Sequence, residues 1–462
     1  MRQLLRDIWD AVRGYEHDYT QIKLSKAILL LSIPMVFEML MESIFAVIDM
    51  FYVSKLGDEA IAVVGLTESM MTLVYAIAMG LSMATTGLVA RRIGEKKDRD
   101  ASVAASQSIL IGIIISLVIA VPGIIFAKRI LGLMHAEAEV IRIGSGFTRF
   151  MLGGNVVVML LFINNAILRS AGAPALSMRV LIIANAFNLI LDPCLIFGLG
   201  PFPELGITGA AIATNIGRGI GVLYQFYLLA SRKSRIEIFL SDFRMRLKIM
   251  GKVIYLSGGG VVQHLIATSS WIFLYRILAE YKSEVLSGYT IAIRIFVFFL
   301  LPAWGISNAA ATLVGQNLGA NNPARAESSV WKTSLVSSIY MGAVMLIFLL
   351  FPGSLIQFFS EEGNQSYTVA VTCLKIMGMG MVFYGFEMII AQSFNGAGDT
   401  YTPSALNFFG FWMIQIPLAI YLAKILGMKE NGVFYAILIS EAILAILGVF
   451  IFKLGRWKTR KV

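Results

Sequence analysis

Residues 184–198 read ANAFNLILDPCLIFG and form the centre of an apolar run with an aspartate in its middle. A charged side chain at the depth of the hydrocarbon costs about 3 kcal/mol, so an acid placed there is a candidate for function. Asn185, Asn188 and Asp192 are spaced three and four residues apart, which puts them on one face of a helix. We expect this face to bind a ligand; the alternative is a polar seam that joins neighbouring helices.

Pro193 directly follows the aspartate. Proline has no N–H to donate and its ring clashes with the carbonyl four residues earlier, here that of Leu189. We therefore predict a hinge at Pro193 and a freed carbonyl oxygen that adds to the polar cluster.

The composition indicates a membrane protein. Of 462 residues, 58% are hydrophobic and 14% are charged, whereas soluble proteins are nearer half apolar and a quarter charged. The net charge of +10 is spread over the short gaps between apolar runs, which favours membrane orientation and predicts no nucleic-acid partner. Cys194 and Cys373 lie within apolar runs and match no disulfide or metal pattern. No P-loop, metal motif or nucleophile elbow occurs, so we expect neither an enzyme nor a cofactor.

Twelve apolar runs are each long enough to cross about 30 Å of hydrocarbon as a helix. The sequence thus predicts an all-α membrane fold with twelve transmembrane helices; strands are excluded because the runs are long and do not alternate. The predicted spans are residues 27–53, 60–89, 102–126, 146–168, 174–199, 207–230, 250–278, 286–315, 330–359, 367–394, 403–426 and 432–454.

Lysine and arginine are concentrated in every second connection. The rich segments are the N-terminus, residues 91–99, residues 232–248 and the C-terminus, whereas the intervening connections are poor in these residues. Because basic loops remain on the cytoplasmic side, we predict a multi-pass protein of the cell membrane with both termini in the cytoplasm.

The chain also repeats itself. Residues 88–94, LVARRIG, recur 225 positions later as LVGQNLG at 313–319, and other short matches share nearly that offset. Six spans per half give both halves the same membrane orientation, so we predict two pseudo-symmetric six-helix bundles related as a parallel repeat. The predicted segments are a cytoplasmic N-terminal segment (1–26), a first lobe (27–231), a basic cytoplasmic linker (232–249), a second lobe (250–454) and a cytoplasmic tail (455–462).

The first run carries a row of acids. Glu38, Glu42 and Asp49 fall within about 40° of one another on a helix, and Pro34 lies one turn earlier as a second predicted hinge. Such a face must look into protein or a water-filled cavity. Close carboxylates either bind a cation or a proton, or are partnered by arginines such as Arg218 or Arg294.

Other polar residues inside the runs are weaker candidates for a cavity wall, since hydrogen bonds between helices are the alternative explanation for each. They are Asn165, Thr214, Glu68, Gln263, His264, Arg294, Glu387 and Gln392.

Three motifs resemble the multidrug and toxic compound extrusion (MATE) family. They are Pro34 followed by DMFYVSKLG at 49–57, NLILDP at 188–193 with GITGAAIAT at 206–214, and NGAGDT at 395–400 followed by Thr402-Pro403. The resemblance covers essentially the whole chain. It implies a V-shaped pair of bundles that exports organic cations in exchange for inward Na⁺ or H⁺. Nothing in the sequence demands more than a monomer in the lipid bilayer.

By position, the resemblance implies a site for the coupling cation, Na⁺ or H⁺, in the first lobe at Asp49, Asn188, Asp192 and Thr214, with Asn165 nearby. NorM-like members carry acids in the seventh and tenth spans. Here residues 258–264 read GGGVVQH and Glu387 stands about one turn from the family position, so the chain is more similar to the DinF-like or archaeal branch. Glu38, Glu42 and Glu68 have no family counterpart; we expect them to make the cavity more negative.

Two alternatives to a multidrug antiporter remain open at this stage. A flippase for lipid-linked or amphipathic precursors would need a cavity lined by Arg and Lys, whereas the spans here hold more acids than bases. A channel or receptor would need a sensing domain, and the chain has no soluble segment of that size.

Overall fold

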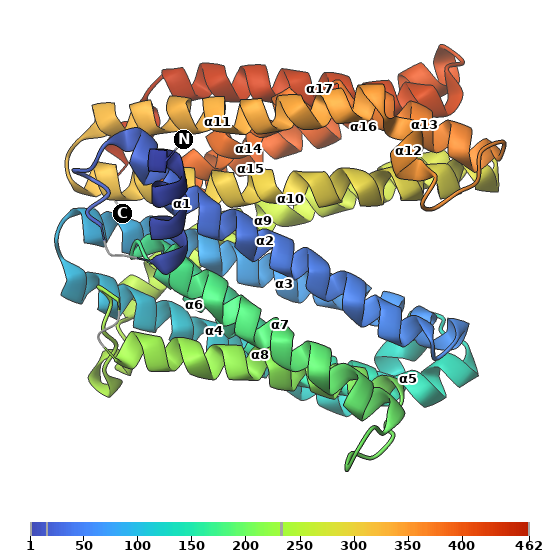
Figure 1. Ribbon diagram of the computed structural model, residues 1–462, viewed down its shortest axis with the longest axis horizontal. Coiled ribbons are helices and arrows are strands. Elements are labelled where there is room, and N and C mark those ends of the chain that lie inside the picture. The colour runs from blue at the N-terminus through green and yellow to red at the C-terminus, as the bar shows by residue number, and fades with distance from the viewer. Residues whose placement is uncertain (1, 15–16, 232–233, 461–462) are drawn as a thin grey trace.

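The computed structural model describes residues 2–14, 17–231 and 234–460, which form helices joined by short connections and contain no strand (Figure 1). The predicted all-helical class is therefore confirmed. Arg232, Lys233 and Lys461, which belong to the predicted basic segments, lie outside the described residues.

A short helix, α1 (Arg2–Arg13), precedes the long ones and runs across their direction in Figure 1. The remaining helices fall into two sets, which we call the first half (α2–α8) and the second half (α9–α17). The first half consists of α2 (Leu24–Ser54), α3 (Asp58–Gly94), α4 (Asp98–Leu133), α5 (Ala138–Gly153), α6 (Asn155–Ser170), α7 (Pro174–Phe197) and α8 (Ile207–Ala230).

The second half follows the 3₁₀ turn η1 (Leu240–Phe243) and is less regular. Its last but one span, from Tyr401 to Ile425, alternates between α- and π-helical winding around Pro417, which has no N–H for the regular bond. The elements are α9 (Leu247–Leu278), α10 (Ser283–Gly319), α11 (Pro323–Leu350), α12 (Pro352–Ile356), α13 (Gln365–Gly378), α14 (Met381–Gly396), α15 (Tyr401–Asn407), η2 (Phe408–Gln415), α16 (Ile416–Ile420), η3 (Tyr421–Ile425), α17 (Lys429–Lys453) and η4 (Arg456–Thr459).

Ten helical stretches among the described residues are long and apolar enough to cross a membrane, or eleven if α13 and α14, bent by 54°, are counted as one span. The helix α8 is not among them. The span predicted at 330–359 ends earlier, at Leu350, because Phe351, directly before Pro352, leaves the helical conformation (φ −128°, ψ 33°), and Pro352 starts the short α12.

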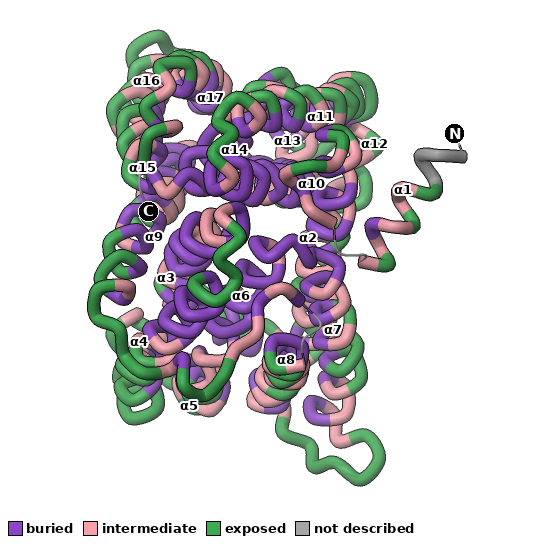
Figure 2. Tube along the Cα trace, turned by 90° about the vertical axis from the view of Figure 1, so that its left-hand side faces the viewer, coloured by how far each residue is buried: buried purple, intermediate pink, exposed green. Residues whose placement is uncertain are grey.

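The surfaces of the long helices are apolar on the outside as well as the inside. On α4, Val118 is 68% exposed and Ile125 is 63% exposed, whereas Ile109 is fully buried. A water-soluble bundle would not leave such a continuous apolar belt uncovered, but hydrocarbon accepts it at no cost. Burial is concentrated where the two halves meet, and the exposed residues form the rim (Figure 2).

The halves are packed together at one end of the bundle, which we call the terminal end. It carries both chain termini and the α3–α4 connection (Figure 1). Here Gly94, the last residue of α3, faces Gly319, the last residue of α10: a Cβ on Gly94 would lie 2.0 Å from the Gln316 carbonyl oxygen, and one on Gly319 would lie 2.1 Å from that of Arg91. These glycines are equivalent positions of the two sequence repeats, so the repeat motif forms the contact between the halves.

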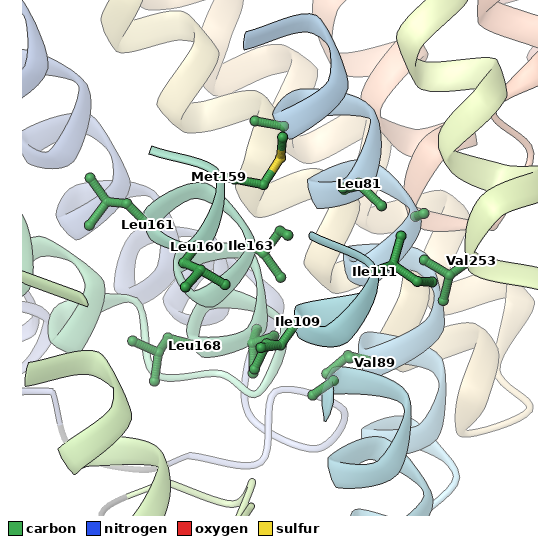
Figure 3. Close-up of a cluster of buried hydrophobic side chains, with 14 of the residues drawn as sticks. Leu81, Val89, Ile109, Ile111, Met159, Leu160, Leu161, Ile163, Leu168 and Val253 are labelled. Carbon is green, nitrogen blue, oxygen red and sulfur yellow. The ribbon is translucent and has the colours of Figure 1, made fainter. Parts of the chain in front are cut away.

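Apolar packing reinforces that contact. The core of the first half, built from α3, α4 and α6 around Leu81, Ile109 and Ile163, also takes in Val253 of α9 (Figure 3). The second half therefore begins inside the core of the first, and the two halves interlock rather than merely touch.

The N-terminal segment crosses the same end. Asp18 forms an ion pair with Lys96 of the first half, while Arg325 of the second half donates to the carbonyls of Tyr19, at 3.1 Å, and Ile22. Lys26 at the start of α2 binds Asp7 of α1 at 3.2 Å. The segment thus bridges both halves at the terminal end.

Candidate functional site

A cavity of about 360 Å³ lies between the two halves, lined mainly by α2, α3, α6 and α8 on one side and by α10 and α14 on the other. Its wall combines acids, amides and hydroxyls with methionine and aromatic side chains. The charged, amide and hydroxyl residues are Glu38, Glu42, Asp49, Glu68, Tyr75, Ser82, Thr86, Asn165, Arg169, Thr214, Arg218, Asn308, Gln392 and Asn395.

The predicted acidic face of the first span opens onto this cavity. Glu38, Glu42 and Asp49 all line it, as their spacing on one helix face indicated, and Glu68 of α3 joins them from the side. The structure thus brings together four acids that lie in two different helices.

Glu38 is bound by an arginine that the sequence did not single out. Arg169, at the end of α6, donates to the Glu38 carboxylate, which is only 1% exposed. Arg169 lies one residue beyond the predicted fourth span, which ends at residue 168. In the fold, its guanidinium reaches from the end of α6 to Glu38 on α2 and lines the cavity.

Glu42 is paired with Arg218 of α8, one of the two partners considered from the sequence, with 3.7 Å between Oε2 and Nη2. The same guanidinium donates to the Tyr75 hydroxyl at 3.3 Å and lies 4.7 Å from the centre of the Phe45 ring. Such a stacked, hydrogen-bonded arginine has a fixed position. With four acids and two arginines in the wall, the cavity has a formal charge of −2.

Asp49 and Asp192 lie on the neighbouring helices α2 and α7. Asp192 is fully buried, accepts a hydrogen bond from the Asn188 amide at 3.0 Å, and is within range of electrostatic repulsion from Asp49. In the described part of the chain, one oxygen of each carboxylate has no hydrogen-bond partner. Asp49 lines the cavity and Asp192 does not, so the pair connects the cavity wall with a buried position behind it.

Two further predicted site residues also lie at the wall. Thr214 of α8 lines the cavity, and so does Asn165 of α6, whose side-chain oxygen accepts from Gln225 at 2.7 Å. Asn188 lies behind the wall, at a small groove between α2 and α7.

The chemistry of this donor set suits a proton or a small hard cation. Among residues 2–14, 17–231 and 234–460, no three His, Cys, Asp or Glu side chains are grouped to hold a metal. The two carboxylates together with amide and hydroxyl oxygens are, however, the ligand types that Na⁺ takes, and either a proton or Na⁺ would relieve the repulsion between Asp49 and Asp192.

The second half contributes a neutral wall. Asn395 donates to Gln392 at 3.0 Å, and Gln392 donates to Asn308 at 3.2 Å, which forms a chain of amides along the cavity. The predicted residue Gln263 stands behind this chain and accepts from Asn395 at 3.4 Å. Trp304 of the second half adds an aromatic side chain to the wall, and the first half adds the methionines Met39, Met50, Met79, Met83 and Met151.

Several other predicted residues do not line the cavity, among them His264 of α9. Arg294 is exposed on α10, and Glu387 lies within the second half near the buried Glu441. Pro34 and Pro193 both lie inside helices that continue past them, in α2 and α7 respectively. Near Pro34 the helix α2 touches α10 closely, because a Cβ on Gly305 would lie 2.7 Å from the Met35 carbonyl oxygen.

Comparison with known proteins finds similarity along nearly the whole chain. A family model described as MatE matches residues 34–194 and again residues 261–421, two stretches that begin 227 residues apart. The chain is 23% identical over 447 residues to the "Probable multidrug resistance protein NorM" of Thermotoga maritima, which covers 95% of this chain and 94% of that protein. It is 25% identical over 442 residues to the "Multidrug export protein MepA" of Staphylococcus haemolyticus, covering 94% of each.

A solved structure of similar fold is the "Outward-facing conformation of a multidrug resistance MATE family transporter of the MOP superfamily". It matches with a TM-score of 0.88 at 24% identity and covers 96% of this chain and 98% of that one. At this identity the likeness concerns the fold.

Proposed function

The chain belongs to the MatE family, and from that premise we propose that it is a secondary active multidrug efflux antiporter, which exports organic cations in exchange for Na⁺ or H⁺ by alternating access. As a member of this family it is a multi-pass membrane transporter and not an enzyme, and transporters of the family need no cofactor. Its placement in the DinF-like or archaeal branch stays a prediction.

The observation that carries the proposal is the Asp49–Asp192 pair. A carboxylate in the cavity wall repels a fully buried one on another helix, and each keeps an oxygen without a partner among the described residues. Binding of one cation, with Asn188 and Thr214 as further oxygen donors, would draw α2 and α7 together. Loss of that cation would return negative charge to the wall at Asp49.

The charge of the wall favours cationic cargo. Its formal charge of −2 attracts organic cations and repels anions, while Phe45, Trp304 and the methionines offer polarisable surface for flat or bulky groups. We propose that cargo and coupling ion compete for the same negative potential, so that entry of Na⁺ or H⁺ releases the cargo.

We propose that the terminal end faces the cytoplasm and that the described conformation is closed there. Support comes from the basic segments, which gather at this end, and from the contact of Gly94 with Gly319. In the conformation that is open at the terminal end, these glycines would be separated and α2 would bend at Pro34.

We further propose twelve spans, with α8, which matches the run predicted at 207–230, as the twelfth. Its 24 residues would extend about 36 Å, and its polar Arg218 and Thr214 face the cavity rather than lipid. The proposed segments are unchanged: lobes at 27–231 and 250–454, the linker at 232–249, and cytoplasmic ends at 1–26 and 455–462. A monomer contains the whole cavity and is the proposed unit.

A flippase of lipid-linked precursors is the alternative, and the cavity argues against it. A pyrophosphate group requires a net positive site, but the two arginines that line this wall are already paired with Glu38 and Glu42.

The test is uptake of ethidium into proteoliposomes under separately imposed Na⁺ and pH gradients. We expect one of the two gradients to drive transport by the wild type. Asp49→Asn and Asp192→Asn should abolish gradient-driven transport, because a neutral amide cannot exchange a cation.

Glu68→Gln is the matched control, since it removes one acid of the same wall but leaves the carboxylate pair intact. It should transport more weakly but remain coupled to the gradient. Undiminished gradient-driven uptake by both aspartate variants would overturn the proposed mechanism.

A further inference from the structure

A second cavity, of about 300 Å³, lies at the terminal end, where α3 and α4 of the first half meet the start of α9. It shares no lining residue with the cavity between the two halves, which we call the transport cavity. We call it the basic cavity, because its charged lining consists of Arg92, Arg246, Lys248 and Lys252 with a single acid, Asp100.

Three of the four bases are available to a ligand. Arg92 donates to Glu95 at 2.7 Å, which takes up part of its charge. Arg246, Lys248 and Lys252 are exposed at the mouth, and the one acid in the lining cannot neutralise all three. The lining as a whole has a formal charge of +3, opposite in sign to the transport cavity.

The backbone that presents these bases is held in place. The amide of the fully buried Gln107 on α4 donates to the carbonyls of Asp242 at 2.8 Å and Arg244 at 3.0 Å, and its oxygen accepts from the Arg246 N–H at 2.9 Å. The start of α9 is therefore fixed against α4 before any ligand binds, which lowers the ordering cost of binding.

The cavity lies at the start of α9, a helix long and apolar enough to cross a membrane, where lipid headgroups are expected. Lys248, Lys252 and Tyr255 follow one face of α9 at intervals of four and three residues. Tyr255 is 61% exposed and its ring lies 4.8 Å from that of Tyr401, which forms an aromatic pair one turn below the lysines. Tyrosine at this position between charged and apolar surface is typical of the membrane interface.

The floor of the cavity is apolar. Val103, Ala104 and Leu88 are buried there, and Ile249 closes the side toward α9. A phosphate group at the mouth would meet the bases, and a glycerol backbone would rest on this floor. A free phosphate ion would use only the bases and not the apolar floor.

We infer that the basic cavity binds the phosphate headgroup of an anionic phospholipid. The lipid binds where the two halves meet and joins them at the terminal end. Basic pockets between membrane helices are a recurrent form of headgroup site. The inference concerns a different cavity from the proposed transport site and does not depend on the coupling ion or the cargo.

The experiment is native mass spectrometry of the full-length protein, delipidated in detergent and titrated with dioleoylphosphatidylglycerol or with dioleoylphosphatidylcholine. We expect tighter binding of the anionic lipid, and we expect this preference to weaken as salt is added. Lys248→Gln/Lys252→Gln should bind phosphatidylglycerol about thirty-fold more weakly, at about fivefold for each lysine.

The matched control is Lys23→Gln/Lys332→Gln, which removes two exposed lysines at the same end but outside the cavity. It should retain the wild-type affinity. Equal loss in both double variants, or equal binding of the two lipids, would overturn the inference. Displacement of the lipid by inorganic phosphate at matched ionic strength would assign the site to free phosphate and overturn the lipid assignment. Ethidium transport by the variants is a separate readout, so failure of either proposal is distinguishable from failure of the other.

Discussion

Replacing Gly94 by alanine should open the terminal end. In the described conformation the new Cβ would lie 2.0 Å from the Gln316 carbonyl oxygen and 2.9 Å from its Cα. Carbon and carbonyl oxygen normally approach no closer than about 3.3 Å, so α3 and α10 must separate by more than about 1 Å. The three nearest atoms all belong to the backbone of Gln316, so no side-chain rotation relieves the clash.

The expected size of the effect follows from that geometry. Overpacking a well-packed contact costs about 1–3 kcal/mol, which corresponds to a change of about 5- to 150-fold in the ratio of closed to open conformations at this end. An alanine also favours the helix itself by up to about 1 kcal/mol over glycine, in both conformations. The higher helix propensity of alanine should therefore raise the overall stability without changing the ratio of closed to open conformations.

The assay is a distance measurement between spin labels at Asp98→Cys on α4 and Ala324→Cys on α11, both exposed at the terminal end, with Cys194 and Cys373 replaced by serine. Gly94→Ala should add or enlarge a population with a longer distance. Gly342→Ala is the control, since a Cβ there meets no atom within 4 Å. An unchanged distance distribution in Gly94→Ala, with the protein still folded, would show that the two repeat glycines do not hold the halves together.

Two further predictions concern stability. Arg169→Gln should lower the thermal unfolding midpoint in detergent, because breaking a buried ion pair costs about 3–5 kcal/mol and Glu38 is only 1% exposed; Glu38→Gln/Arg169→Gln should recover most of the loss, and a double variant no better than the single one would contradict the pairing. Partial burial raises the pKa of Asp18, but hydrogen bonds from Lys96 and Thr20 outweigh it and lower the pKa from 3.8 to about 2. Since the folded value lies below the unfolded one, Asp18 stabilises the fold above about pH 4 and loses this effect as the pH falls toward 2. The difference in stability between wild type and Asp18→Asn, measured by chemical denaturation, should shrink over that range, and a difference that stays constant would argue against the Lys96 contact.

Much of the fold was predictable because its causes are local. An apolar run in hydrocarbon has to satisfy its own backbone groups, so runs of two dozen residues become helices whatever surrounds them. The repeated LVARRIG and LVGQNLG motifs likewise revealed the duplication, and the MatE model matches both halves at nearly the same offset. The predicted end of the ninth span at 359 was wrong because hydropathy alone does not reveal that the backbone turns at Phe351, ahead of Pro352, and ends the helix at 350.

The candidate site was predictable only in part. The spacing of Glu38, Glu42 and Asp49 placed them on one face, and that face lines the cavity. Nothing in the sequence indicated that Arg169, 131 residues away from Glu38, would neutralise it, or that Asn308 and Asn395 would form the opposite wall. Spacing along a helix predicts which side chains share a face, but a partner on another helix depends on how the helices are arranged.

From its amino acids alone, this chain had to be a bundle of membrane helices built from two related halves, since length, hydropathy and repetition act within each segment. Whether an acid inside that bundle meets an arginine or another acid was decided by how the helices assemble. Packing of the helices placed arginines beside Glu38 and Glu42, whereas Asp49 has an acid, Asp192, on the neighbouring helix α7. The physical reason is that the energy of a buried charge depends on its neighbours in space, and those neighbours come from distant parts of the chain.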